Sequence, residues 1–234
     1  MNYKLSSSAL KLIALLSMTI DHIAYYCGVS GLAYEVMRSI GRIAFPVFAF
    51  LLVEGYIHTH SKQRYFLSLV VFALISQVPW WLLNRDSSLN VFFTLALGLV
   101  VLQVIDTLQS LRPITTTTHL WKLPSFIATV VAIATICALA TYLDVDYTYR
   151  GILLIVLFRL LRGNYPLLAL FSLPLMYVYG ITGYLLALAV LATYNHRRGF
   201  IPQGSAWKYA FYAYYPVHLT VLRVFHDMLD KLII

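Results

Sequence analysis

The sequence predicts an all-α protein, a polytopic bundle of about nine transmembrane helices (range about eight to ten) that forms one domain over residues 1–234. Two properties of the 234-residue chain support this prediction: 61% of its residues are hydrophobic and only 11% are charged. A soluble domain has roughly half apolar and a quarter charged residues. In addition, apolar stretches long enough to cross a hydrocarbon layer, about 17–25 residues, recur from end to end.

The apolar stretches place the helices in chain order. We expect them over Ala9–Val29, Ser39–Ile57, Tyr65–Leu83, Val91–Leu108, Pro124–Leu143, Thr148–Leu161, Tyr165–Tyr179, Gly180–Tyr194 and Lys208–Phe225. The sixth to eighth are short for a complete crossing. Prolines bend helices or mark their ends, which is the role expected of Pro46, Pro79, Pro166, Pro174 and Pro216.

Loop charges predict the orientation. With nine crossings, one set of loops holds 11 cationic residues: Lys4, Lys11, Lys62, Arg64, Arg112, Lys122, Arg159, Arg162, Arg197, Arg198 and Lys208. The opposite set holds 6: Arg38, Arg42, Arg85, Arg150, Arg223 and Lys231. Cytoplasmic loops are enriched in Lys and Arg, so the N-terminus is expected in the cytoplasm. The net charge of +8 thus reflects topology. Because the cations form no stripe, no nucleic-acid partner is expected.

The two cysteines, Cys27 and Cys137, are far apart and make no metal-binding pattern, so no metal is expected. Both are interpreted as small apolar packing residues.

Ionisable residues inside the helices are the candidates for function, because each is costly in a membrane and usually faces a bundle interior or a wet cavity. His22 and His218 each lie about seven residues from the outer end of a helix, roughly 10 Å deep. Arg42 enters from the same side. Neighbouring residues on a helix do not face each other, so Asp21 is expected to pair with Arg42 rather than with His22. Asn90 and Arg150 begin their own helices on this side and are expected to join the site.

A second polar group lies toward the cytoplasmic side. Glu54 and His58 are four residues apart, share a helix face and are expected to pair. With Lys11 at a similar depth, they are expected to line a cytoplasmic mouth. An ordinary interfacial charge pair is the alternative.

Several segments resemble the TraX family in order and spacing, from about Leu10 to Leu222. They are LKLIALLSMTIDHIAYY (10–26), SIGRIAFPVFAFLLVEGYIHT (39–59), LNVFFTLALGL (89–99), YRGILLIVLFRLLR (149–162) and FYAYYPVHLTVL (211–222). The most specific pieces are the Asp-His pair and Gly-Arg-x-Ala-Phe-Pro-x-Phe-Ala.

The resemblance implies an integral-membrane acetyltransferase in the cytoplasmic (inner) membrane of a bacterium. The family's namesake acetylates the N-terminal residue of a pilin. Related enzymes carry acetyl from cytosolic acetyl-CoA to an acceptor on the far side. On the matched positions, Asp21 and His22 inherit the catalytic pair, Arg42 the family arginine and His218 the histidine of the last helix.

For an acetyl-CoA donor and an amine or hydroxyl acceptor, the residues divide into three roles. His22 is the expected base or acetyl carrier, and Arg42, Asn90 or protonated His218 the expected oxyanion donor. The expected substrate-binding residues are Asn90, Glu54, His58, Arg150 and Tyr215. The expected anchors for the acetyl-CoA phosphates are Lys11, Lys62, Arg64, Arg197 and Arg198.

Other interpretations of the polar residues stay open. They would form an ion-coupled site in a small-solute or proton-coupled transporter. In a scaffold, they would only hold helices together. The acceptor itself is expected in the envelope, as a peptide N-terminus, an amino sugar or a polymer hydroxyl.

Overall fold

The computed structural model describes residues 4–110, 122–201 and 205–233. These residues form ten α-helices and a short 3₁₀ helix: α1 (Ser7–Tyr26), α2 (Gly31–Gly41), α3 (Ala44–His58), α4 (Lys62–Asn84), α5 (Val91–Ser110), α6 (Lys122–Tyr142), α7 (Thr148–Leu160), α8 (Tyr165–Met176), η2 (Tyr177–Tyr179), α9 (Ile181–Ala192) and α10 (Ser205–Ile233). Arg112, one of the cations counted for orientation, lies outside the described residues.

The predicted multi-pass membrane architecture is confirmed. Five helical segments are long and apolar enough to cross a membrane, and one of them is the joined segment Gly31–His58, which contains α2 and α3. Counted in this way, the described residues contain nine helical segments, as the sequence predicts. The two largest differences in boundaries are that the second segment begins at Gly31 rather than Ser39 and that the last extends from Ser205 to Ile233.

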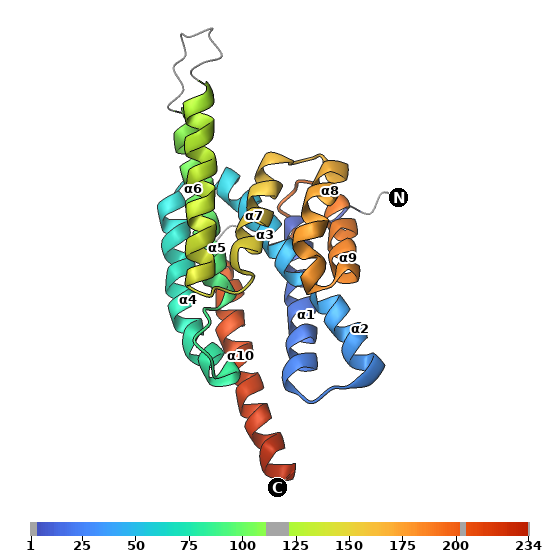
Figure 1. The fold of residues 1–234 in the computed structure, drawn as a ribbon. Helices are drawn as coiled ribbons and strands as arrows, with labels where there is room; N and C mark the ends of the chain where they lie inside the picture. The colour runs from blue at the N-terminus through green and yellow to red at the C-terminus, as the bar shows by residue number, and fades with distance from the viewer. Residues whose placement is uncertain (1–3, 111–121, 202–204, 234) are drawn as a thin grey trace.

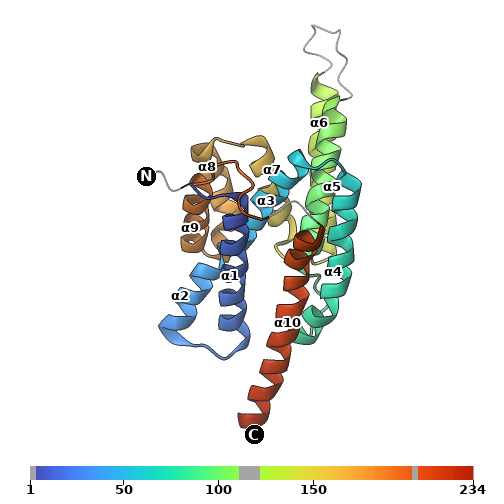
Figure 2. The ribbon, with the colours of Figure 1, turned by 180° about the vertical axis from the view of Figure 1, so that it is seen from behind.

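Helix α3 occupies the centre of the bundle. Of its 15 residues, 11 are buried, which fits its apolar, charge-poor sequence. On one side lie α4, α5, α6 and α10, on the other α1, α2, α8 and α9, with α7 beside α3 (Figure 1; Figure 2 shows the reverse). The long helix α6 lies at the edge, and only a small part of its surface is buried inside the protein.

A bend between α2 and α3 shapes the predicted site. Pro46 has no N–H to donate to the carbonyl of Arg42, four residues earlier, and its ring crowds that carbonyl. The helix accordingly breaks at Arg42 and Ile43. The Ser17 hydroxyl of α1 donates to the carbonyls of Ile40 and Gly41, where α2 ends. The bend thus fixes the arginine side chains of α2 relative to α1.

Two further contacts position the elements around the site, one between α9 and α2 and one between two loops. A Cβ on Gly183 of α9 would lie 2.2 Å from the Ser39 carbonyl oxygen, so only glycine allows α9 to approach so closely. A single β-bridge joins the α4–α5 and α6–α7 loops: the Leu89 N–H donates to the Asp144 carbonyl at 3.0 Å, and the Asp146 N–H donates to the Leu89 carbonyl at 2.8 Å. This bridge places the residues after Asp144 at the end of the bundle that is predicted to be outer.

Candidate functional site

A cavity of about 210 Å³ lies at the end of the bundle formed by the α1–α2, α4–α5 and α6–α7 loops, the end predicted to be outer. Its walls are mostly polar and aromatic: Asp21, His22, Tyr25, Tyr26, Arg38, Arg42, Trp80, Asn84, Asp146 and Tyr147. Three of the four residues predicted to be catalytic, Asp21, His22 and Arg42, therefore line one cavity.

Asp21 holds two arginines across the bend. Its Oδ2 lies 2.7 Å from Nη1 of Arg38, and its Oδ1 lies 3.8 Å from Nε of Arg42. The expected contact with Arg42 is present, but Arg38 is the closer partner. Gly41 makes this arrangement possible, because a Cβ there would lie 2.2 Å from Asp21 Oδ1. Gly41 thus makes room for Asp21, and Pro46 causes the bend that brings Arg42 near it.

His22 contacts His218, as their similar depth predicts. Nδ1 of His22 lies 2.7 Å from Nε2 of His218, and the two rings are nearly parallel, with an interplanar angle of 5°. His218 is buried behind His22 and is not a lining residue of the cavity. Its own Nδ1 lies 3.0 Å from the carbonyl oxygen of Tyr214.

These contacts determine the tautomer of each neutral imidazole. The Tyr214 carbonyl only accepts, so Nδ1 of His218 carries the proton and donates it. Nε2 of His218 is then an acceptor, and Nδ1 of His22 must be the donor to it. Nε2 of His22 is left with its lone pair as the nitrogen available to the cavity. A histidine held in this way has the geometry of a base or a nucleophile.

The α6–α7 loop contributes Asp146 and Tyr147 to the cavity wall. The Tyr147 side chain hydrogen-bonds Arg42 and stacks on Phe45 with ring centroids 3.7 Å apart. Removal from water raises the pKa of the Asp146 carboxyl to about 7, and the Arg42 guanidinium opposes that shift. Asp146 thus places a carboxyl that is partly protonated near neutral pH within the cavity wall.

Replacing Asp21 with Asn is expected to destabilise the fold by about 3 kcal/mol, because Arg38 and Arg42 would lose their carboxylate partner in a site largely shielded from water. Thermal unfolding in detergent measures the effect. Asp144→Asn, an exposed change on the α6–α7 loop, is the matched control. Adding Arg38→Gln to Asp21→Asn should recover part of the loss. Wild-type stability in Asp21→Asn would contradict the pairing.

Asn90, Arg150 and Tyr215 are not lining residues of the cavity. The Asn90 amide donates to the Ala73 carbonyl and to Gln77, and its oxygen accepts from the Phe92 N–H. It therefore joins α4 to the start of α5. The Arg150 guanidinium lies over the Tyr149 ring. Tyr215 packs against both His22 and His218, so it supports the histidine pair from behind.

The contacts of the three expected oxyanion donors differ. The Asn90 amide donates to Ala73 and Gln77 within the protein. In protonated His218, the Nδ1 proton would face the Tyr214 carbonyl and the Nε2 proton would face His22. Of the three expected donors, only Arg42 lines the cavity.

The expected pair of Glu54 with the His58 side chain is wrong. The Glu54 carboxylate binds Arg162 in a bidentate manner, with Nε–Oε1 at 2.7 Å and Nη2–Oε2 at 3.1 Å. The exposed His58 instead donates from Nδ1 to the backbone carbonyl of Glu54. The carboxylate is therefore occupied in tying α3 to the α7–α8 loop. Substrate contact by either residue stays a prediction.

The predicted phosphate anchors lie at the opposite end of the bundle from His22. Lys11 is in the second turn of α1, with its ammonium 5.5 Å from the Phe211 ring centroid. Lys62 and Arg64 are in the first turn of α4, and Arg197 and Arg198 are exposed in the loop after α9. Their binding of acetyl-CoA stays a prediction.

Most residues of the cavity wall are not predicted from the sequence. The sequence places Arg38 among the loop cations, although it precedes Arg42 by four residues and can share its helix face. Trp80, Asn84 and Asp146 come from a helix end and a loop at the end of the bundle predicted to be outer, and that side is all that the sequence predicts for them. Within the described residues, no three His, Cys, Asp or Glu side chains are grouped so that they would hold a metal ion.

The sequence is similar to those of known proteins. A stretch of 116 residues is 34% identical to a protein from Dichelobacter nodosus named probable fimbrial assembly protein FimC, serogroup H1. The match covers 44% of this chain and 48% of that protein, so the chain spans about half the length of this curated relative. No solved structure matches the chain. The family described as TraX protein matches residues 6–226, nearly the whole sequence. The chain belongs to the TraX family.

Proposed function

We propose that the protein is an integral-membrane acetyltransferase that moves an acetyl group from cytoplasmic acetyl-CoA to an amine or hydroxyl acceptor on the outer side. The observation that carries the proposal is the free Nε2 of His22 at the wall of a polar cavity, with its tautomer set by His218. Membership of the TraX family supports the same reaction class.

In the proposed reaction, Nε2 of His22 takes a proton from the acceptor as its nitrogen or oxygen attacks the thioester carbonyl. The new bond forms between the acceptor atom and the carbonyl carbon. Arg42 stabilises the developing oxyanion. The carbon–sulfur bond then breaks, and the departing thiolate of CoA receives the proton from His22. In a two-step variant, Nε2 of His22 carries the acetyl group before the acceptor attacks.

The cavity suits a small acceptor group. Tyr25, Tyr26 and Trp80 supply flat apolar surfaces, and Asp146 supplies a carboxyl group to the same wall. An envelope peptide with a free N-terminus is the acceptor to test first, since the relative from Dichelobacter nodosus is named as a fimbrial assembly protein. Amino sugars and polymer hydroxyls are the other candidates.

The direct test uses the wild-type protein in liposomes with radiolabelled acetyl-CoA. We expect label to appear on a peptide with a free N-terminus and not on the same peptide with a blocked one. Glucosamine and a polyol offered separately identify the other acceptor classes. Uptake of labelled solutes is measured in parallel without acetyl-CoA. No consumption of acetyl-CoA with any acceptor, together with solute uptake, would replace the proposal with a transporter.

A further inference from the structure

A second cavity lies at the opposite end of the bundle and has different chemistry. Its volume is about 430 Å³, and Phe66 of α4 and Leu99, Val100 and Val104 of α5 form its apolar walls. It shares no lining residue with the cavity at His22. Phe66 and Trp80 mark the two cavities on α4, and their separation of 14 residues corresponds to about 21 Å along the helix.

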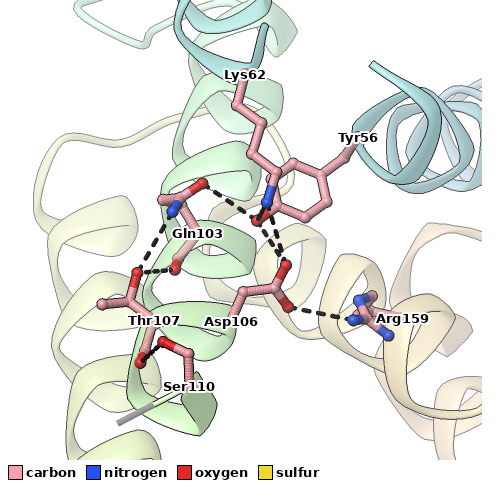
Figure 3. A network of polar contacts seen from close by, with 7 residues as sticks. All are labelled: Tyr56, Lys62, Gln103, Asp106, Thr107, Ser110 and Arg159. Carbon is pink, nitrogen blue, oxygen red and sulfur yellow. Dashed lines mark hydrogen bonds and ion pairs between the residues drawn. The ribbon is translucent and has the colours of Figure 1, made fainter. Parts of the chain in front are cut away.

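The rim of this second cavity is polar. Tyr56, Lys62 and Gln103 line it, and Lys62 lies over the Tyr56 ring at 4.1 Å from the centroid (Figure 3). The Lys62 ammonium donates to the Tyr56 hydroxyl at 2.7 Å and to Asp106 Oδ2 at 3.3 Å. An ammonium has three protons, so one N–H of Lys62 is left to bind a ligand. The Lys62 side chain is 42% exposed and accessible from outside.

The charges around the rim do not cancel. Asp106 accepts from Lys62 on Oδ2 and from Arg159 on Oδ1, the latter at 3.2 Å, so one carboxylate faces two cations (Figure 3). Among the described residues, buried Nε of Arg159 has no hydrogen-bond partner. Lys62, Arg159 and Asp106 together carry one excess positive charge, and of the three only Lys62 lines the apolar space.

The surface beside this cavity suits contact with lipid. Leu67 and Val71, on the turns of α4 next to Phe66, are each 51% exposed. In a membrane-spanning helix, such apolar exposure faces acyl chains. An apolar cavity with a cationic rim near the membrane surface fits a molecule with a hydrocarbon chain and an anionic head group.

We propose that this cavity binds one acyl chain of an anionic phospholipid, whose phosphate is held by Lys62. The site lies on the cytoplasmic side if the loop charges set the orientation as predicted. The proposal does not depend on acetyl transfer.

The test compares retention of dioleoyl phosphatidylglycerol and dioleoyl phosphatidylcholine by the full-length protein, using native mass spectrometry from nanodiscs. We expect a preference of about tenfold for phosphatidylglycerol in the wild type, because both lipids offer a phosphate to Lys62 but phosphatidylcholine also brings a choline cation next to it. Lys62→Gln should remove the preference, and Lys62→Arg should keep it. Arg64→Gln removes a neighbouring exposed cation that does not line the cavity and should change the preference little.

The cavity itself is tested by filling it. Val104→Phe occupies the space from α5, and Gln63→Phe occupies it from the exposed first turn of α4, where misfolding is a smaller risk. Each variant is first shown to have the unfolding temperature of the wild type. The folded variant should then fail to retain the lipid, although Lys62 is intact. Equal retention of both lipids, an unchanged preference in Lys62→Gln, or full retention in the filled variants would overturn the proposal. Displacement of the lipid by acetyl-CoA would assign the cavity to the acetyl donor instead.

Discussion

Replacing His22 with alanine is expected to lower acetyl transfer by roughly a thousandfold or more, because a positioned base contributes about 10²–10⁴ to a rate. Binding of acetyl-CoA and thermal stability should change little, since His22 is one of several residues lining an existing cavity. Initial rates with labelled acetyl-CoA in liposomes measure the loss. Added imidazole should restore part of the rate, as the vacated space leaves room for a free ring.

His60→Ala is the matched control for this variant. His60 is an exposed histidine in the α3–α4 loop, far from His22 in the fold, and its removal should leave transfer unchanged. Wild-type transfer by His22→Ala would remove the proposed base. The wild type is incubated with labelled acetyl-CoA but no acceptor, and the reaction is then quenched. Label on the protein would indicate a covalent acetyl-histidine, and its absence would indicate direct transfer.

Replacing His218 with alanine is expected to lower kcat by about a hundredfold, less than loss of the base itself. Without the acceptor nitrogen of His218, the proton of His22 is no longer held on Nδ1, and the ring loses its fixed orientation. The KM for acetyl-CoA should stay near the wild-type value, because His218 lies behind His22 and is not a lining residue of the cavity.

The conservative variant His218→Gln separates this positioning role from simple packing. The amide oxygen of glutamine can accept from the Nδ1–H of His22, so this variant should recover a substantial part of the rate. If alanine and glutamine lower kcat equally while both variants remain folded, the hydrogen bond between the two histidines does not set the rate. A parallel rise in KM would point to collapse of the cavity.

The sequence predicted the helices well where an apolar run coincides with one crossing. The segment from α4 to α6 follows this rule, because long apolar runs there end at polar loops. The stretch GLAYEVMRSI was harder. It contains Glu35 and Arg38, so it lacks the apolar character of a membrane span, and the predicted helix began only at Ser39. In the fold it is the amphipathic helix α2, which packs on α1 and α9.

For the site, the sequence by itself determined which residues were unusual, and its loop charges predict on which side of the membrane they lie. A charge or an imidazole in an apolar helix is costly, so Asp21, His22 and His218 stand out without any coordinates. The family pattern supplied a reaction class for them. Local chemistry also anticipated a bend near Pro46, which lacks the N–H needed to continue a regular helix.

Only the tertiary structure decided which of these residues meet. Helical periodicity describes one helix at a time, and contacts between helices depend on packing, rotation and tilt. Thus Glu54 binds Arg162, which lies 108 residues later in the chain, rather than its helical neighbour His58. In the same way, Arg38 joins Arg42 at Asp21, and the carbonyl of Tyr214 sets the proton positions that leave Nε2 of His22 free.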